Sequence, residues 1–250
     1  MINVILSGCC GHMGKVVTGL INEQENMTIV AGVDVSNGTL PFPVYAEFSQ
    51  IKESAHVIID FSHPSCLDGL LRFAVENKVP AVVCTTGLSS CQIDAIRDAS
   101  TEVPMFFSGN MSLGINLLAA LVKKAAQVLG DKADIEIIEA HHNLKLDAPS
   151  GTANMLLDAA IEGLDKEMIP EYDRHSRRQQ RPKNEIGMHS IRGGTIVGEH
   201  EVIFAGKDEI VTLSHSARSK EVFAVGAVKA AAFMVGKEPK LYDMTDLVSQ

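Results

Sequence analysis

Short runs of β-branched and other apolar residues alternate with longer amphipathic stretches through the first part of the chain. The runs predict buried strands and the stretches between them predict helices. The predicted strands are 3–7, 28–33, 57–60, 81–84 and 103–107, and the predicted helices are 13–22, 65–76 and 89–99. Strands that alternate with helices over short loops are typical of a parallel, doubly wound sheet. We therefore expect an α/β fold here.

The pattern changes after Met111. It predicts helices at 113–129 and 153–164, a strand at 135–140, and strands around 191, 199–205 and 209–215. No long helical pattern separates the last three strands, which favours a mostly antiparallel sheet in a second, α+β domain. A final helix at 222–234 is expected to return to the first domain.

Composition and charge narrow the class of protein. The 250 residues are 46% hydrophobic and carry a formal net charge of −9, which argues against nucleic acid or an anionic membrane as a partner. The chain does not open like a signal peptide, and no apolar run approaches the roughly 20 residues of a membrane span. The five cysteines form no CxxC pair, which favours free thiols in the cytoplasm and no zinc site.

A glycine-rich segment follows the first predicted strand and opens the first helix. It reads Gly8-Cys9-Cys10-Gly11-His12-Met13-Gly14, a GxxGxxG spacing. Such glycines let backbone N–H groups approach a pyrophosphate at a helix N-terminus. The spacing does not fit a P-loop, because Val16 follows Lys15 where that motif has Ser or Thr. A plain tight turn would explain the glycines equally well.

Asp34 favours the dinucleotide interpretation. It ends the second predicted strand 20 residues after Gly14, where a carboxylate binds the adenosine ribose. The alternative is a turn aspartate ahead of Asn37 and Gly38. Val35 follows, so no arginine is placed to neutralise a 2′-phosphate. This favours NADH at least as much as NADPH.

Two later predicted strands end in loops of small and hydroxyl-bearing residues. These loops are Cys84-Thr85-Thr86-Gly87 and Ser108-Gly109-Asn110-Met111. Ligands bind at the carboxyl edge of such sheets, and small residues there allow close approach of a nicotinamide. Taken one at a time, each segment is also consistent with an ordinary loop.

The densest candidate chemistry lies between residues 139 and 152. His141 and His142 end a strand, Lys145 follows, and Ser150-Gly151-Thr152 opens a helix where hydroxyls and free N–H groups can bind an anion. These groups suit binding of a dianion and delivery of a proton. Individually, packing histidines, a solvated lysine and a helix cap would explain them. Their concentration favours a reaction centre.

The residues of both regions resemble one enzyme family. The segment 139–153, Glu-Ala-His-His-x-x-Lys-x-Asp-Ala-Pro-Ser-Gly-Thr-Ala, is similar to the signature of 4-hydroxy-tetrahydrodipicolinate reductases. The similarity extends to 8–14, 60–64, 85–87, 110–112, 191–194 and 198–204. It implies a Rossmann-like dinucleotide-binding domain at 1–111 with 220–250, and a substrate-binding and oligomerisation domain at 112–219.

The resemblance also implies roles. It implies reduction of 4-hydroxy-tetrahydrodipicolinate by NADH or NADPH with loss of water, in lysine and diaminopimelate biosynthesis. His141 and Lys145 would be catalytic, and His142, Ser150, Gly151 and Thr152 would bind the dicarboxylate. The cofactor residues would be Gly8, Cys9, Cys10, Gly11, His12, Met13, Asp34, Cys84, Thr85, Thr86, Ser108, Gly109, Asn110 and Met111.

A homotetramer joined through the second domain's sheet is also expected. The resemblance implies it, and the apolar strand 202–204 would otherwise leave an exposed edge. Two rival functions remain open at this point. One is a Rossmann oxidoreductase acting on another small amino or aldehyde acid, and the other is a non-catalytic dinucleotide sensor. The two histidines and Lys145 argue against a sensor, which needs no proton donor.

Overall fold

The computed structural model describes residues 1–36, 38–130, 132–164 and 166–249. It contains two compact units, one of Met1–Ser112 with Glu221–Gln250 and one of Leu113–Lys220. The domain boundaries expected from the sequence differ from this division by one residue at each crossing. Asn37, part of the alternative turn interpretation of Asp34, lies outside the described residues. Among the described residues, no helix has both the length and the apolar character needed to cross a membrane.

The first unit is built on a seven-stranded sheet whose strand pairs are all parallel. Its order is β12-β6-β5-β4-β1-β2-β3. The strands are β1 (Ile2–Ser7), β2 (Met27–Val33), β3 (Val44–Tyr45), β4 (Val57–Asp60), β5 (Ala81–Val83), β6 (Met105–Phe107) and β12 (Leu241–Tyr242). The chain runs outward in both directions from β1, so a topological switch point lies between β1 and β4. This confirms the predicted Rossmann-like sheet.

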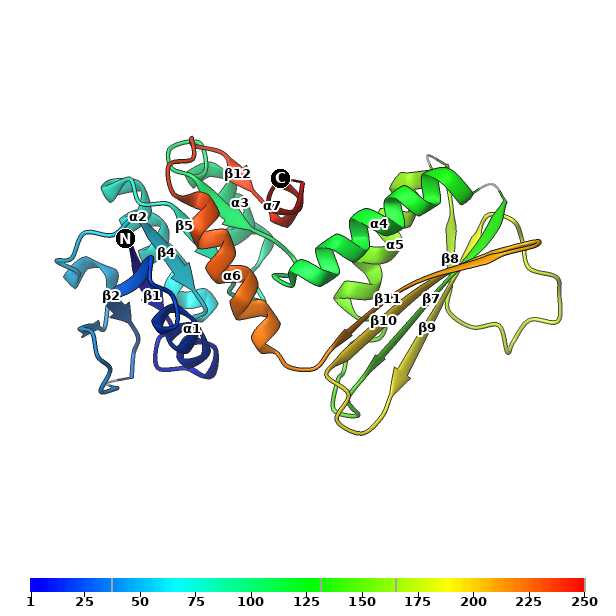
Figure 1. Cartoon of the computed structure of the whole chain (residues 1–250), viewed down its shortest axis with the longest axis horizontal. Helices are drawn as coiled ribbons and strands as arrows, with labels where there is room; N and C mark the ends of the chain where they lie inside the picture. Colours follow the sequence, from blue (N-terminus) through cyan, green and yellow to red (C-terminus); the bar gives the residue numbers. More distant parts are fainter. Residues whose placement is uncertain (37, 131, 165, 250) are drawn as a thin grey trace. The chain divides into compact units, whose positions relative to one another are not determined.

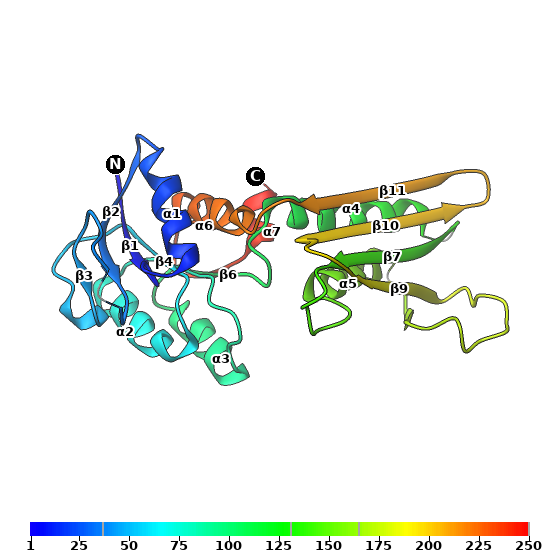
Figure 2. The same ribbon diagram turned by 90° about the horizontal axis from the view of Figure 1, so that it is seen from below.

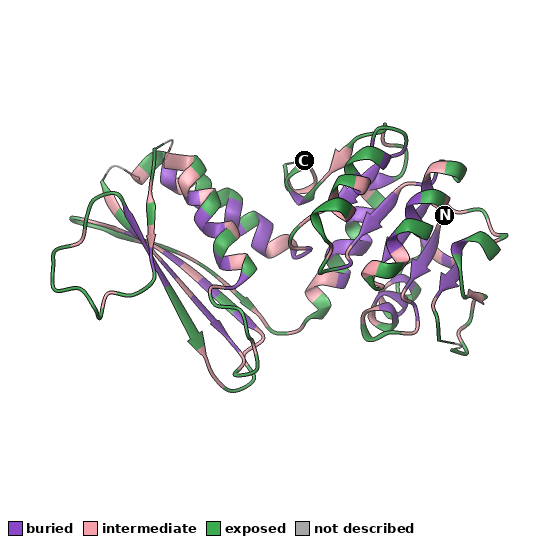
Figure 3. Cartoon of the chain, turned by 180° about the vertical axis from the view of Figure 1, so that it is seen from behind, coloured by how far each residue is buried: buried purple, intermediate pink, exposed green. Residues whose placement is uncertain are grey.

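Helices cover both faces of this sheet (Figures 1 and 2). On one face lie α1 (His12–Asn22) and α6 (Glu221–Met234), and on the other lie α2 (Leu67–Asn77) and α3 (Ser90–Ala99). Short elements complete the unit: η1 (Phe48–Gln50), η2 (Pro64–Cys66) and α7 (Met244–Val248). The buried residues concentrate on the strands and on the helix faces that cover them (Figure 3). The loops that follow the strands are thus placed at the ends of a sheet whose strands are largely buried.

The second unit packs two helices on one face of a five-stranded sheet (Figure 1). The helices are α4 (Leu113–Leu129) and α5 (Gly151–Leu164). The strands, in sheet order, are β11 (Ile210–Ala217), β10 (Gly198–Gly206), β7 (Ala133–His141), β9 (Glu185–Arg192) and β8 (Ile169–Glu171). The core between the layers contains apolar residues of α4, α5, β7, β9 and β10.

This second sheet is mixed, which corrects the expectation of a mostly antiparallel one. β10 pairs antiparallel with β7 and β11, whereas β9 pairs parallel with β7 and β8. The physical reason is the connection from β7 to β9. It includes α5 and is long enough for a crossover, which returns the chain in the same direction.

The expectation of an exposed edge at residues 202–204 is also wrong. These residues lie in β10, which is hydrogen-bonded on both sides. Val202 and Phe204 are buried against the helices. Side chains alternate along a strand, so Ile203 points to the opposite face of the sheet. No helix or strand of the second unit's described residues covers that face, and we call it the outer face of the sheet (Figure 2).

Candidate active site

The glycine-rich turn lies where β1 ends and α1 begins. Gly8 has φ +76°, and its amide donates to the Val33 carbonyl of β2 at 2.8 Å. A Cβ at Gly8 would collide with the Phe61 carbonyl oxygen, and one at Gly14 would collide with the Gly8 carbonyl oxygen. Both glycines are therefore required by close backbone approach. No side chain caps the N-terminus of α1, which leaves that end of the helix suited to an anion.

Asp34 connects the end of β2 to this turn. Its Oδ2 accepts from the Cys10 amide at 2.9 Å, and its Oδ1 accepts from the Ser36 amide at 2.8 Å. The second bond is the local turn that the alternative interpretation required, and the first one reaches across to the glycine-rich turn. Val35 is 85% exposed and offers no charge. The carboxylate thus borders the glycine-rich turn.

Two thiols also lie in the turn. Cys9 is fully buried, and burial, helped by Cys10 and Asp34, raises the pKa of its thiol to about 12. Cys10 is half-buried and donates from Sγ to the Ser36 carbonyl at 3.3 Å. The fully buried Cys9 side chain thus packs in the core, while Cys10 lies closer to solvent.

Asp60, at the end of β4, organises the neighbouring strand ends. Its carboxylate accepts from the Ser62 hydroxyl at 2.5 Å and from the Thr85 hydroxyl at 2.6 Å. Burial raises the pKa of Asp60, although these hydrogen bonds oppose the rise. The Thr85 hydroxyl is therefore committed to Asp60. The sequence showed Asp60 only as part of a motif, because its partners are distant along the chain.

The two remaining loops of the first unit end β5 and β6. Burial raises the pKa of the Cys84 thiol. Thr86 is exposed. The Ser108 hydroxyl donates to the Asn110 carbonyl, and the Asn110 side-chain oxygen accepts from the Ser112 amide at 2.8 Å. All these loops follow parallel strands, so they share the carboxyl edge of the sheet with the glycine-rich turn and Asp34.

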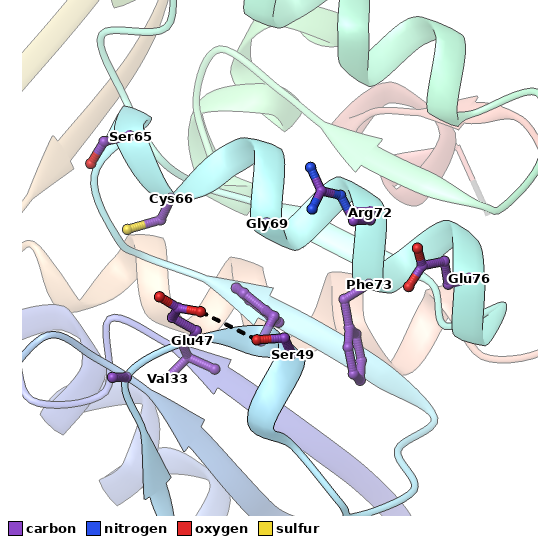
Figure 4. Close-up of a pocket in the computed structure, with 11 residues that line it drawn as sticks. Val33, Glu47, Ser49, Ser65, Cys66, Gly69, Arg72, Phe73 and Glu76 are labelled. Carbon is purple, nitrogen blue, oxygen red and sulfur yellow. Dashed lines mark hydrogen bonds between the residues drawn. The ribbon is translucent and has the colours of Figure 1, made fainter.

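A pocket of about 270 Å³ lies between η1 and α2 (Figure 4). Phe48 and Phe73 provide apolar walls, and Glu47, Arg72 and Glu76 supply charged groups. None of the cofactor residues expected from the sequence lines this pocket. The pocket is therefore separate from the predicted cofactor residues.

In the second unit, the side chains of Arg192, Glu139 and His141 are joined by hydrogen bonds at the end of β7, and we call these three side chains the relay. The Glu139 carboxylate lies 2.5 Å from Nδ1 of His141, and Arg192 of β9 donates to both Glu139 oxygens at 2.7 and 2.9 Å. Strand alternation puts Glu139 and His141 on one face, and the β7–β9 register pairs His141 with Arg192. Glu139 is 1% exposed, so its charge acts in a site shielded from water.

The charge of Glu139 determines which ring nitrogen of His141 carries the hydrogen. Burial opposes ionisation, but hydrogen bonds from Arg192, Ser190 and His141 lower the pKa of Glu139 to about 2. An ionised carboxylate only accepts, so Nδ1 of His141 must carry the hydrogen. Nε2, which lies against Gly198, is then the nitrogen that can exchange a proton with a substrate.

His200 of β10 packs against this relay. Its ring meets that of His141 edge-on, with 5.2 Å between centroids. Burial, and then His141, lower the pKa of His200 to about 4, so it is neutral at neutral pH. Its Nε2 lies 3.3 Å from the Ser150 hydroxyl, which accepts from the Ala153 amide at the start of α5. Ser150 is buried and caps this helix, as one alternative interpretation of the sequence proposed.

The other predicted substrate groups surround the same helix start. Nζ of Lys145 lies 2.8 Å from the Asp147 carboxylate, and its side chain is 22% exposed. The hydrogen bond from Lys145 lowers the pKa of Asp147. Gly151 is exposed, and Thr152 and His142 are half-buried. Hydrogen bonds through Glu139, Arg192 and Asp147 thus link His141 and Lys145 to the start of α5.

The first unit has a Rossmann-like sheet with a glycine-rich turn, and the second unit has a histidine–lysine centre. Together these features are typical of a dinucleotide-dependent oxidoreductase. Two family models match the chain in order: "Dihydrodipicolinate reductase, N-terminus" over residues 2–111 and "Dihydrodipicolinate reductase, C-terminus" over residues 114–248. The chain belongs to the dihydrodipicolinate reductase family, and its first unit is a dinucleotide-binding domain that uses NAD(P)H.

Individual relatives agree with this assignment. A 4-hydroxy-tetrahydrodipicolinate reductase of Caldanaerobacter subterraneus subsp. tengcongensis is 52% identical over 250 residues, covering 100% of this chain and 99% of that one. A 4-hydroxy-tetrahydrodipicolinate reductase of Clostridium novyi is 47% identical over 249 residues, covering 99% of this chain and 98% of that one. The dipicolinate-bound dihydrodipicolinate reductase of Paenisporosarcina sp. TG-14 has the same fold, with a TM-score of 0.80, 24% identity and 97% coverage of each chain.

A more distant structure shares the fold more loosely. Aspartate dehydrogenase of Thermotoga maritima superposes with a TM-score of 0.53 at 12% identity, covering 95% of this chain and 98% of that one. The two-unit architecture therefore extends to oxidoreductases whose names indicate other substrates. The fold alone therefore does not identify the substrate.

Proposed function

We propose that this protein reduces 4-hydroxy-tetrahydrodipicolinate to tetrahydrodipicolinate with NAD(P)H and loss of water, in lysine and diaminopimelate biosynthesis. The observation that carries the proposal is the match of both reductase models in order along the chain. The geometry of the second unit agrees with it. A lysine close to a helix N-terminus suits binding of a carboxylate, and an oriented histidine suits proton transfer.

In this proposal the second unit binds the substrate and supplies protons. Lys145 and His141 act as proton donors or acceptors, and His142 with Ser150, Gly151 and Thr152 binds the carboxylates. Ser150 would contribute through its backbone at the start of α5, because its hydroxyl already caps that helix. Nζ of Lys145 is already paired with the Asp147 carboxylate, at 2.8 Å. A substrate carboxylate would replace this partner, whose side chain is 57% exposed and can return to solvent.

The chemistry divides between the two units. When bound, the reduced nicotinamide supplies a hydride. Loss of the substrate hydroxyl as water leaves a conjugated imine, which gains the hydride and one proton. Lys145 and His141 are the groups proposed to move protons in these two steps. The Glu139 carboxylate would stabilise a protonated His141 and keep its Nε2 directed outward.

The first unit is proposed to hold the dinucleotide. Residues 8–13 and the α1 N-terminus would receive the pyrophosphate, Asp34 the adenosine ribose, and the loops 84–86 and 108–111 the nicotinamide end. We propose that NADH is used at least as well as NADPH. Asp34 would repel a 2′-phosphate, Val35 offers no cation, and the exposed His12 would compensate only in part. A kcat/KM for NADPH ten times that for NADH would contradict this.

We also propose a cytoplasmic homotetramer joined through the outer face of the second unit's sheet, with no nucleic-acid or membrane partner. β10 is internal to the sheet, so it offers no exposed edge for assembly. The support is instead the apolar content of that face, where Ile191 is 51% and Ile210 is 67% exposed. Light scattering at micromolar concentration should give four chains for the wild type and fewer for Ile210→Glu. A monomeric wild type would refute the proposal.

The rival functions predict different results in one experiment. Purified protein is mixed with NADH and either the dicarboxylate precursor or a panel of small amino and aldehyde acids. We expect NADH oxidation with the precursor only. Turnover with a panel member alone would favour another Rossmann oxidoreductase, and tight NADH binding without turnover would favour a sensor. Pyridine-2,6-dicarboxylate, a planar dicarboxylate, should compete with the substrate.

A further inference from the structure

Three potential metal ligands meet at the glycine-rich turn. Sγ of Cys9, Sγ of Cys10 and a carboxylate oxygen of Asp34 all lie within 4.8 Å of one another. The two sulfur atoms are 4.0 Å apart. Thiolate and carboxylate oxygen are a donor set that Zn²⁺ accepts, and catalytic-type zinc sites use three protein ligands with water in the fourth position.

The spacing is close to that of a tetrahedral site. Zn–S bonds of about 2.3 Å at the tetrahedral angle put two sulfurs about 3.8 Å apart, and a sulfur and an oxygen about 3.6 Å apart. The observed S···S distance of 4.0 Å needs almost no adjustment. The separation of the oxygen from a sulfur must shorten by about 1.2 Å at most, since the ligand atoms lie within 4.8 Å of one another. Cys10 and Asp34 are only half-buried, so their side chains can make this movement.

The surrounding backbone leaves room for both thiols. A Cβ at Gly32 of β2 would come within 2.6 Å of Sγ of Cys9, and a Cβ at Gly38 within 2.7 Å of Sγ of Cys10. Glycine at these two positions therefore leaves the space that the two sulfurs occupy. The Asp34 oxygens each accept one backbone hydrogen bond, and a carboxylate oxygen retains a second lone pair for a cation.

We propose that Cys9, Cys10 and Asp34 form a binding site for Zn²⁺, and that the bound ion excludes the dinucleotide. The exclusion rests on the proposed function, which assigns Asp34 to the ribose and residues 8–13 to the pyrophosphate. Binding would displace the two thiol protons to solvent and leave a water as fourth ligand. The reductase would then be inhibited by Zn²⁺ competitively with NADH. The motif is hidden in the sequence because Asp34 lies 24 residues after Cys10.

Cadmium is a suitable spectroscopic probe of the site, since thiolate-bound Cd²⁺ absorbs in the ultraviolet where the free ion does not. Reduced full-length protein, freed of metal with a chelator, is titrated with Cd²⁺, and Zn²⁺ is then added to displace it. We expect one ion per chain with two thiolates. Cys10→Ser should weaken binding by more than about 100-fold, beyond the usual loss for outer-shell changes.

Cys91→Ser is the matched control, because Cys91 is an exposed thiol in α3 of the same unit. It should bind Cd²⁺ as the wild type does. The proposal is overturned if the wild type gives no thiolate absorption, or if Cys10→Ser binds as tightly as Cys91→Ser. Circular dichroism of Cys10→Ser should match that of the wild type, which separates loss of a ligand from loss of fold.

The exclusion of the dinucleotide is tested by repeating the titration with NADH present. At about 100 times the Kd of NADH, strict competition raises the apparent Kd of Cd²⁺ about 100-fold. An unchanged Cd²⁺ affinity in NADH-saturated protein would overturn the exclusion. If NADH itself fails to bind, the proposed function fails, whereas the thiolate absorption and its loss in Cys10→Ser still decide the metal site.

Discussion

Replacing Glu139 with glutamine tests the relay at the end of β7. The substitution keeps the size of the side chain but removes the charge shared by His141 and Arg192. The difference between the ordinary carboxyl pKa of 4.5 and the pKa of about 2 for Glu139 corresponds to about 3 kcal/mol at 1.36 kcal/mol per pH unit. Glu139 is 1% exposed, so solvent screens little of this energy.

The stability effect has a defined pH dependence. A lowered folded-state pKa stabilises the fold above the unfolded pKa, and the contribution is lost as pH falls through the folded pKa. Glu139→Gln should therefore reduce the free energy of unfolding by about 3 kcal/mol at neutral pH. The difference from the wild type should shrink between about pH 4.5 and pH 2. Urea unfolding across this range measures it.

The same change should act on turnover. Without the carboxylate, the positive charge that develops on His141 loses its partner, and outer-shell changes of this kind cost about 10–100-fold. We expect kcat to fall by that factor while the Kd for NADH stays constant, because the proposed dinucleotide residues lie in the first unit. Glu162→Gln is the control: its exposed pair with Lys123 at 2.8 Å contributes little. A kcat for Glu139→Gln within twofold of the wild type would refute a role of the relay in turnover.

Other substitutions divide the labour further. Lys145→Ala should lower kcat by about 10²–10⁴ and raise the substrate KM. Lys124→Ala, an exposed change in α4, should do neither. A wild-type kcat in Lys145→Ala would remove Lys145 from the chemistry. His142→Ala should act mainly through substrate KM, and an effect confined to kcat would contradict its binding role. Asp60→Asn should weaken NADH binding by about tenfold by releasing Thr85, measured by fluorescence titration; unchanged NADH affinity would leave Asp60 a purely structural role.

Much of the fold follows from local pattern. The helix at 113–129 has the bounds predicted for it, since its apolar spacing is continuous. The short edge strands β3 and β12, of two residues each, carry no periodicity to detect. The parallel pairing of β9 depends on a crossover that strand counting cannot show.

The site shows the same division. The glycine-rich turn, Asp34 and the histidine–lysine segment are visible in the sequence because their residues are close together or at a known spacing. Strand alternation could have shown that Glu139 shares a face with His141. Its pairing with Arg192 could not be seen, because it depends on the register between β7 and β9. The same holds for the Cys9–Cys10–Asp34 cluster, which needs β1 and β2 side by side.

The central claim is tested most directly by following NADH absorbance in a coupled assay. Aspartate semialdehyde and pyruvate are condensed enzymatically, and this protein is then added with NADH. The account predicts oxidation of one NADH for each molecule of condensation product, and its loss when the condensing enzyme is omitted. NADH oxidation that is absent, or that is unchanged without the condensing enzyme, would contradict the account.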